Sequence, residues 1–145
     1  MKITKILLTL LCLLALVFSL ASCDTTTTNP AEDLGPWKNA TYRSDKSFGE
    51  GAVTFMLDVK VGENSVRFTV STDEETVGAA LLAHGLIDGE EGAYGLYVKK
   101  VNGITADYDV DGSYWAFYID GEYAMTGVDS TIVAAGGRYE LRYEK

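Results

Sequence analysis

Residues 94–129, YGLYVKKVNGITADYDVDGSYWAFYIDGEYAMTGVD, decide the fold. Two apolar, aromatic runs flank an acidic loop, and a tight turn at Asp120 and Gly121 leads into a short third run. An Asp-Gly pair between such runs predicts a β-hairpin with a type I′ turn. The stretch holds six of the nine tyrosines and one of the two tryptophans, without a charge cluster suited to catalysis. It therefore indicates strands that carry a surface for binding.

Two segments upstream alternate between apolar and polar side chains. The apolar positions are Val53, Phe55, Leu57 and Val59 in the first segment, and Val66, Phe68 and Val70 in the second. A period of two residues is typical of strands with one buried face. Residues 61–64, Val-Gly-Glu-Asn, have turn chemistry, so the pair predicts a hairpin with one apolar face.

A helix is predicted over residues 76–84, TVGAALLAH, and it would cover that face. Thr76 is suited to an N-cap, and Gly85 stands where a glycine ends a helix, with Leu86 as its hydrophobic partner. Gly78 lowers the helix propensity by about 1 kcal/mol relative to alanine. We therefore expect Gly78 to pack closely against the sheet.

The remaining elements complete the expected order. We predict a short edge strand at residues 40–43, a loop at 88–92, and a strand at 94–101 with a bulge at Lys99 and Lys100. A turn at Asn102 and Gly103 follows, then strands at 114–119, 122–125 and 138–143. The order hairpin, helix, strand, hairpin, strand indicates an α+β, β-grasp-like fold, with one helix packed on a small mixed β-sheet and a β-hairpin extension.

The N-terminus resembles a bacterial lipoprotein signal. Lys2 and Lys5 precede an apolar run over residues 6–20, which is close to the ~7–15 residues of a signal peptide and short for a membrane span of ~20. The run closes in Leu-Ala-Ser-Cys, similar to a lipobox, whose cysteine is acylated, with palmitate for instance. We predict lipidation at Cys23, which anchors an extracytoplasmic protein to the membrane at the bacterial cell surface. The alternative is an ordinary secretory signal with a chance cysteine.

Composition divides the chain into four segments. Residues 1–22 are the predicted signal peptide, and residues 23–36, polar and rich in threonine, are a predicted disordered tether. Residues 37–52 form an N-terminal arm, and residues 53–145 form the folded domain. Cys12 leaves with the signal and Cys23 is taken by lipid, so no thiol is left for a disulfide, a metal or a nucleophile.

The charge excludes nucleic acid as a partner. The chain has 12 basic and 21 acidic residues, a formal net charge of -9, and loss of Lys2 and Lys5 makes it -11. Such a charge repels phosphates and anionic headgroups. His84 is the only histidine, and we interpret it as a favourable contact at the helix end in preference to a base or ligand. Because no Ser-His-Asp set, P-loop, dinucleotide or zinc motif is present, we predict neither enzyme activity nor a cofactor.

Three phrases resemble the bacterial domain of unknown function 4430. They are residues 72–87 (TDEETVGAALLAHGLI), residues 94–130 around the W-x-x-Y-I-[DN]-G run at 115–121, and residues 138–145 (RYELRYEK). That family is similar to the C-terminal β-domain of transcobalamin and intrinsic factor, and it is often found on lipoproteins. The resemblance covers residues 53–145 and implies a ligand-binding β-grasp domain with a cobalamin-like small molecule as ligand. It also implies weak binding unless a partner closes the site.

Asp107, Asp109 and Asp111, with Gly112, form D-x-D-x-D-G, the opening of an EF-hand calcium loop. However, position twelve is Tyr118 where the loop needs a bidentate glutamate, and a strand is predicted where an EF-hand has a helix. We favour a solvated turn between strands, with a weak calcium site as the alternative.

The aromatic side chains leave two functions open. Tyr97, Tyr118 and Tyr123 are predicted to form a platform for a flat, partly apolar small molecule such as a corrinoid, with Tyr114 and Trp115 as further contacts. Strand parity favours Trp115 as a core residue. The alternative is a cell-surface module that docks a protein partner by strand addition or by its tyrosine-rich face.

Overall fold

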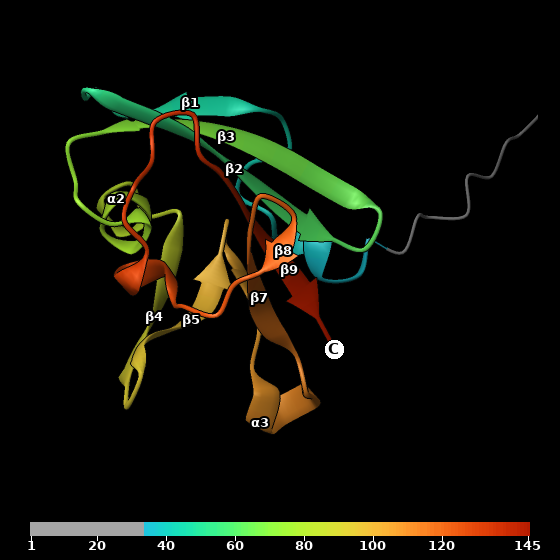
Figure 1. Ribbon diagram of the computed structural model, residues 1–145. Helices are drawn as coiled ribbons and strands as arrows, with labels where there is room; N and C mark the ends of the chain where they lie inside the picture. The colour runs from blue at the N-terminus through green and yellow to red at the C-terminus, as the bar shows by residue number, and fades with distance from the viewer. Residues whose placement is uncertain (1–33) are drawn as a thin grey trace, which may run out of the picture. The chain divides into compact units, whose positions relative to one another are not determined.

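Strands are the main secondary structure of residues 34–145, the part of the chain that this computed structural model describes (Figure 1). The predicted signal peptide at 1–22, the predicted lipidation of Cys23 and residues 23–33 of the predicted tether lie outside the described residues. Within residues 34–145 no helix has the length and apolar character needed to cross a bilayer. The domain is mostly β-sheet with two α-helices, and it is thus an α+β fold.

The elements follow one another along the chain. In order they are η1 (Gly35–Asn39), β1 (Lys46–Phe48), β2 (Val53–Val61), β3 (Asn64–Thr72), α2 (Val77–Ala83), β4 (Ile87–Gly92), β5 (Gly95–Val101), β6 (Ile104–Thr105), α3 (Tyr108–Asp111), β7 (Tyr114–Ile119), β8 (Glu122–Tyr123), η2 (Val128–Ser130) and β9 (Arg138–Glu144).

These strands form two sheets. The larger one has the order β1-β3-β2-β9-β7-β8, and the smaller one has the order β4-β5-β6. In the larger sheet β2 pairs with β9 in parallel, and β1 pairs with β3 in parallel, while the other neighbours are antiparallel. The first hairpin and the last strand therefore meet at the centre of one mixed sheet, as Figure 1 shows.

The first hairpin has the predicted turn and parity. β2 and β3 pair from Val53 with Thr72 to Val61 with Asn64. Phe55, Leu57 and Val59 are fully buried, while the residues between them are partly exposed. The alternation in the sequence thus places one face of this hairpin in the core.

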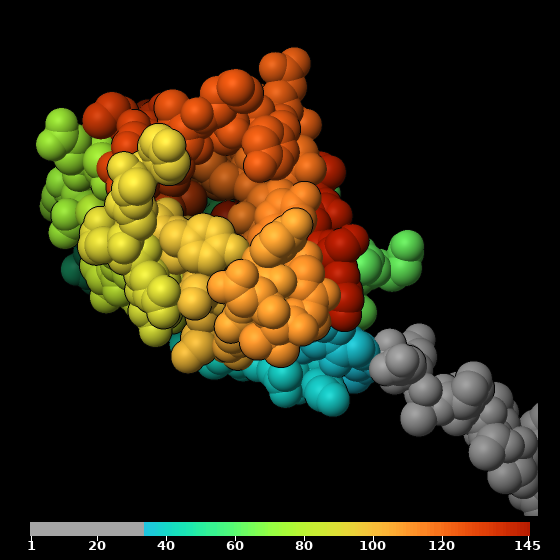
Figure 2. Space-filling view, turned by 90° about the horizontal axis from the view of Figure 1, so that it is seen from below, coloured from blue at the N-terminus to red at the C-terminus, as the bar shows by residue number. Residues whose placement is uncertain are grey.

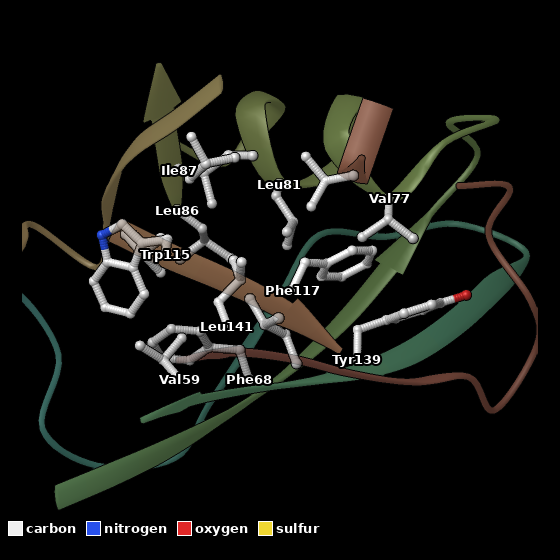
Figure 3. Packing of buried hydrophobic residues seen from close by; sticks show 14 of the residues in the cluster. Val59, Phe68, Val77, Leu81, Leu86, Ile87, Trp115, Phe117, Tyr139 and Leu141 are labelled. Carbon is white, nitrogen blue, oxygen red and sulfur yellow. The ribbon is translucent and has the colours of Figure 1, made fainter. Parts of the chain in front are cut away.

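The core lies between the larger sheet, α2 and the smaller sheet (Figure 3). Val77 and Leu81 come from α2, Ile87 is the first residue of β4, and Leu86 directly precedes it. They pack against buried side chains of the larger sheet. Those labelled in Figure 3 are Val59, Phe68, Trp115, Phe117, Tyr139 and Leu141. Burial of this apolar cluster stabilises the fold.

The helix begins and ends as predicted. The Thr76 side chain accepts a hydrogen bond from the Ala79 N–H at 3.2 Å. Gly85 has a φ of 62°, and the Leu86 N–H donates to the Leu81 carbonyl at 3.0 Å, which closes the last turn. Gly78 was predicted to pack closely against the sheet, and this prediction was wrong. A Cβ at Gly78 would lie 2.8 Å from the backbone nitrogen of Asp129, so the glycine allows η2, and not the sheet, to approach α2 closely.

The edge strand predicted at residues 40–43 is wrong. η1 precedes this segment, and the strand at the edge is β1, Lys46–Phe48. Residues 41 and 42 instead bond to Asn102, whose side chain accepts from the Tyr42 N–H at 2.9 Å and donates to the Tyr42 carbonyl at 2.8 Å. A buried asparagine thereby takes the place of a strand partner.

The segment 88–92, predicted as a loop, is strand β4. Its composition of Asp, Gly and Glu has no apolar alternation, but pairing with β5 holds it extended. Asp88 pairs with Lys100 and Gly89 pairs with Val98, so Lys99 is the extra residue of a bulge, as predicted. The two predicted turns are confirmed, because Asn102, Gly103, Asp120 and Gly121 all have positive φ angles.

Candidate functional site

A groove opens between β5 and the outer edge of β7. β8 pairs with β7 only at Tyr118 and Ile119, because it is two residues long. β5 stands opposite but belongs to the other sheet, so the start of β7 has no strand neighbour on that side among the described residues. The groove thus exists because two strand edges face each other without pairing.

Twelve residues line this groove, which has a volume of about 240 Å³. They come from β5, β7, β8, the segment after β8, and β9: Leu96, Tyr97, Val98, Tyr114, Trp115, Phe117, Tyr123, Ala124, Thr126, Gly127, Val128 and Leu141. Figure 2 shows the hollow between the yellow β4–β5 hairpin and the orange β7–β8 region.

The groove has a buried apolar floor and a solvent-exposed rim. Trp115 and Phe117 are 7% and 8% exposed, and the Trp115 indole donates to the Ile104 carbonyl at 3.3 Å. Tyr97 and Tyr123 are 42% and 60% exposed, so large parts of both side chains are in contact with water. Such a surface offers flat apolar area inside and polar groups outside, which is the usual make-up of a small-molecule site.

Tyr114 lies at the end of the groove nearest α3. Its ring meets that of Tyr108 edge-on at 6.4 Å. Burial raises the pKa of Tyr114, and the negative charge of Glu144 raises it further. The phenol is protonated at physiological pH, as an unperturbed tyrosine also is, so its hydroxyl can donate a hydrogen bond.

Of the five predicted ligand-binding residues, the structure brings four to the groove: Tyr97, Tyr114, Trp115 and Tyr123. Tyr118 does not line it, and the predicted platform of Tyr97, Tyr118 and Tyr123 is not one sheet face, because Tyr97 is in the smaller sheet. Tyr118 faces Tyr123 edge-on at 5.5 Å, and the Arg142 guanidinium lies over its ring at 3.9 Å.

Asp129 holds one wall of the groove, and the sequence gives little sign of it. Its Oδ2 accepts from the Leu96 N–H at 3.1 Å, which ties β5 to η2. Its Oδ1 is buried and has no hydrogen-bond partner among residues 34–145. Side chains at Gly95 and Gly127 would collide with this carboxylate, at 2.4 and 2.7 Å. The two glycines are the signal in the sequence, since they leave room for a carboxylate 33 residues from the strand that it binds.

Two of the three predicted calcium ligands, Asp107 and Asp111, use their carboxylates in local contacts. Asp107 caps α3 by accepting from the Asp109 N–H at 3.1 Å, so a short helix stands where we predicted a solvated turn. Asp111 accepts from the Ser113 hydroxyl and N–H, and these bonds lower its pKa. No group of three histidine, cysteine or acidic residues suited to a metal occurs in residues 34–145.

His84 stands at the C-cap of α2, as predicted for a helix end. Its ring lies beside that of Phe48 at 5.9 Å, on a face that does not line the groove.

The open face of the larger sheet carries an ion-pair cluster around Glu140, which is 9% exposed. Lys60 lies 2.8 Å from this carboxylate, and Arg142 donates a hydrogen bond to it. Burial raises the pKa of Glu140, but the hydrogen bonds and charges of Arg142 and Lys60 outweigh burial, so the pKa lies below its usual 4.5. A lowered folded-state pKa adds stability that is present above about pH 4.5 and is lost as the pH falls through the folded value.

We therefore expect Glu140→Gln to lower the free energy of unfolding by about 1 kcal/mol at pH 7, because it leaves two cations without their carboxylate. Thermal unfolding from pH 7 to pH 3 measures this loss, with Glu144→Gln as the matched control on the same strand. The gap to wild type should close below about pH 4.5. A gap that stays constant over the whole range would contradict the assignment.

These features define a class, a small α+β domain of two sheets with an aromatic groove where their edges meet. The chain belongs to the DUF4430 family, a domain of unknown function, and the family model matches residues 74–145. This match confirms the resemblance drawn from the sequence. No curated protein matches the chain.

Solved structures that are similar to this chain include the following two. One is a protein from Ruminococcus gnavus, provisionally assigned as a metal-binding protein, with 32% sequence identity and a TM-score of 0.61 over 65% of this chain and 98% of that one. The other is haptocorrin in complex with Cbi, with 24% identity and a TM-score of 0.49 over 68% of this chain and 26% of that one.

Proposed function

We propose that residues 34–145 form a non-catalytic ligand-binding domain whose site is the groove between β5 and β7. One observation carries the proposal. Tyr97, Tyr114, Trp115 and Tyr123, from three strands of two sheets, converge on one groove. Aromatic rings with polar tips, arranged around an apolar floor, favour a flat and partly apolar ligand.

The size of the groove limits what can enter it. Its volume of about 240 Å³ is below the ~300–1,000 Å³ of most ligand pockets, so it encloses a small molecule or one edge of a larger one. The acidic charge of the domain tolerates neutral and cationic ligands and repels anions.

A corrinoid is the ligand that we propose first, because the sequence resembles the transcobalamin-type domain. Only an edge of a corrinoid would fit this groove, and the rest would stay in water unless a second surface covered it. The parallel pairing of β2 and β9 between β3 and β7 supports the finer inference that the fold is a β-grasp variant.

Metal binding is not favoured, although the Ruminococcus gnavus relative is provisionally assigned to it. The acidic residues 107, 109 and 111 are the nearest approach to a metal site, and each is exposed or only partly buried. The Asp107 carboxylate caps α3 and the Asp111 carboxylate accepts hydrogen bonds from Ser113, and the three residues form no group suited to hold a metal ion within residues 34–145.

We also propose that the domain is held at the outer surface of the membrane through an acylated Cys23, on the strength of the lipobox-like run. The expected result of Cys23→Ala is release from the membrane fraction, with Cys12→Ala as the matched control that stays bound. Membrane attachment equal to that of wild type would show that another element is the anchor.

Calorimetric titration of the chain from Asp24 onward with cobinamide and cobalamin tests the groove. We expect dissociation constants in the micromolar range, because one open wall leaves much of the ligand in water. Tyr97→Ala and Tyr123→Ala should each weaken binding by about tenfold, since each removes ring area from the site. Tyr94→Ala is the matched control, because Tyr94 is 99% exposed and does not line the groove.

Absence of heat with any corrinoid at about 100 µM would exclude this ligand class at useful affinity. Binding that Tyr94→Ala weakens as much as Tyr97→Ala does would place the site outside the groove.

A further inference from the structure

Exposed apolar side chains gather at one end of the domain. Eight large ones are exposed among residues 34–145, and six of them come from the β4–β5 hairpin, α3 and the β8 segment: Tyr94, Tyr97, Tyr108, Val110, Tyr123 and Met125. Figure 2 shows these segments, in yellow, light orange and orange, together on one side of the molecule. We refer to these six residues as the apolar face.

The apolar face is wider than the groove. Tyr94, Met125 and Val110 are 99%, 94% and 80% exposed, and none of the three lines the groove. A small molecule in the groove would therefore leave these side chains in water. A cluster of exposed apolar side chains of this kind, framed by polar residues, usually marks a surface that another macromolecule covers.

The charge of the same segments restricts the partner. Residues 87–132 contain nine acidic residues and two basic ones, a net of -7 out of -9 for the whole chain. Lys99 is already paired with Glu90 at 3.3 Å, and Lys145, which reaches this end from β9, pairs with Asp111 at 3.4 Å. The exposed carboxylates of Glu91 and Glu122 have no basic partner in the described part of the chain.

We propose that the apolar face docks a polypeptide whose contact surface is apolar at its centre and rich in lysine and arginine around it. A bilayer with anionic headgroups is disfavoured, because the acidic segments repel it. A second copy of this chain is also disfavoured, because a symmetric contact would place two such acidic faces against each other. Opposite charge, in contrast, speeds association and selects the partner.

Docking at this face does not require a small molecule in the groove. Tyr94 and Met125 contribute to the face and not to the groove, so their substitution separates the two functions.

The test uses the full chain in the cells that produce it, with p-benzoylphenylalanine in place of Tyr94 or of Met125. Illumination should give a protein adduct whose cross-linked peptide, identified by mass spectrometry, contains apolar residues flanked by lysine and arginine. Adding Glu91→Gln and Glu122→Gln should lower the adduct yield by about tenfold, because it removes part of the charge attraction. The control is the same probe at Ser65, an exposed residue of β3.

Four results would overturn the proposal. They are no adduct from Tyr94 and Met125, an equal yield from Ser65, adducts with lipid alone, and a cross-linked peptide that is acidic. Corrinoid titration of the Tyr94→Ser and Met125→Ser variants, after circular dichroism shows them folded, should give unchanged affinity. A parallel loss of both activities would mean that the two sites are one.

Discussion

Leu57→Ala is expected to lower the free energy of unfolding by about 2–5 kcal/mol. Leu57 is fully buried at the centre of β2, between β3 and β9. Removing its methyl groups loses the free energy that is gained when they are transferred from water into the core. It also leaves a cavity that the two flanking strands cannot close without breaking their pairing. Urea unfolding followed by circular dichroism measures the change.

Met56→Ala is the matched control, because Met56 is the neighbouring residue on the open face of the same strand and is only partly buried. It should lower the free energy of unfolding by less than Leu57→Ala does. Equal losses for the two variants would mean that the apolar face of β2 is not the one that enters the core.

Gly78→Ala is expected to destabilise the domain by about 1–3 kcal/mol, although alanine favours a helix. Helix propensity alone predicts a gain of about 1 kcal/mol. The new methyl group, however, would lie 2.8 Å from the backbone nitrogen and 2.9 Å from the Cα of Asp129. Because backbone atoms cannot turn aside as a flexible side chain can, α2 or η2 must shift.

Thermal unfolding measures this loss, and Ala79→Gly calibrates the propensity at the next position of the same helix. A Gly78→Ala variant that is more stable than wild type would show that α2 and η2 are not in close contact. Because η2 also holds Asp129 against β5, this variant should in addition weaken ligand binding in the groove.

The hairpin and the helix were predictable because their signals are local. The period of two residues in β2 and β3 reports which face is buried, and Thr76 and Gly85 report the ends of α2. The turns at Asn102 and Asp120 were likewise predictable, since each is followed by a glycine that tolerates positive φ.

The strand at 88–92 was not predictable by the same rules. β4 is mostly exposed, so it has no buried face to impose alternation, and only its pairing with β5 makes it a strand. The edge strand was misplaced for a related reason, because the Asn102 side chain satisfies the backbone of Tyr42 from 60 residues away. Contacts over such distances leave no pattern in a single sequence.

The groove was predictable in its residue types and not in its shape. Tyr97, Tyr114, Trp115 and Tyr123 were recognisable as amphipathic aromatic residues on strands. Their meeting point depends on the shortness of β8 and on the division of the strands into two sheets. Parity places Tyr118 on the same face as Tyr123, but it does not show that Arg142 covers its ring.

The groove and the apolar face lie next to each other, and this arrangement has a consequence for affinity. A ligand held by one edge in the groove would gain a second wall from a polypeptide on the apolar face. Partner and ligand should then each bind more tightly in the presence of the other, by the same factor, since coupling between two sites is reciprocal.

Chemical-shift mapping with cobinamide is the most direct measurement of the central claim, that the groove is the ligand site. The account predicts that the largest shifts occur at residues 96–98, 114–117 and 123–128, and at the Trp115 indole N–H, while the buried Trp37 indole stays unchanged. Shifts that centre on Arg67 and Glu140, on the open face of the larger sheet, would contradict it, as would a spectrum that does not change.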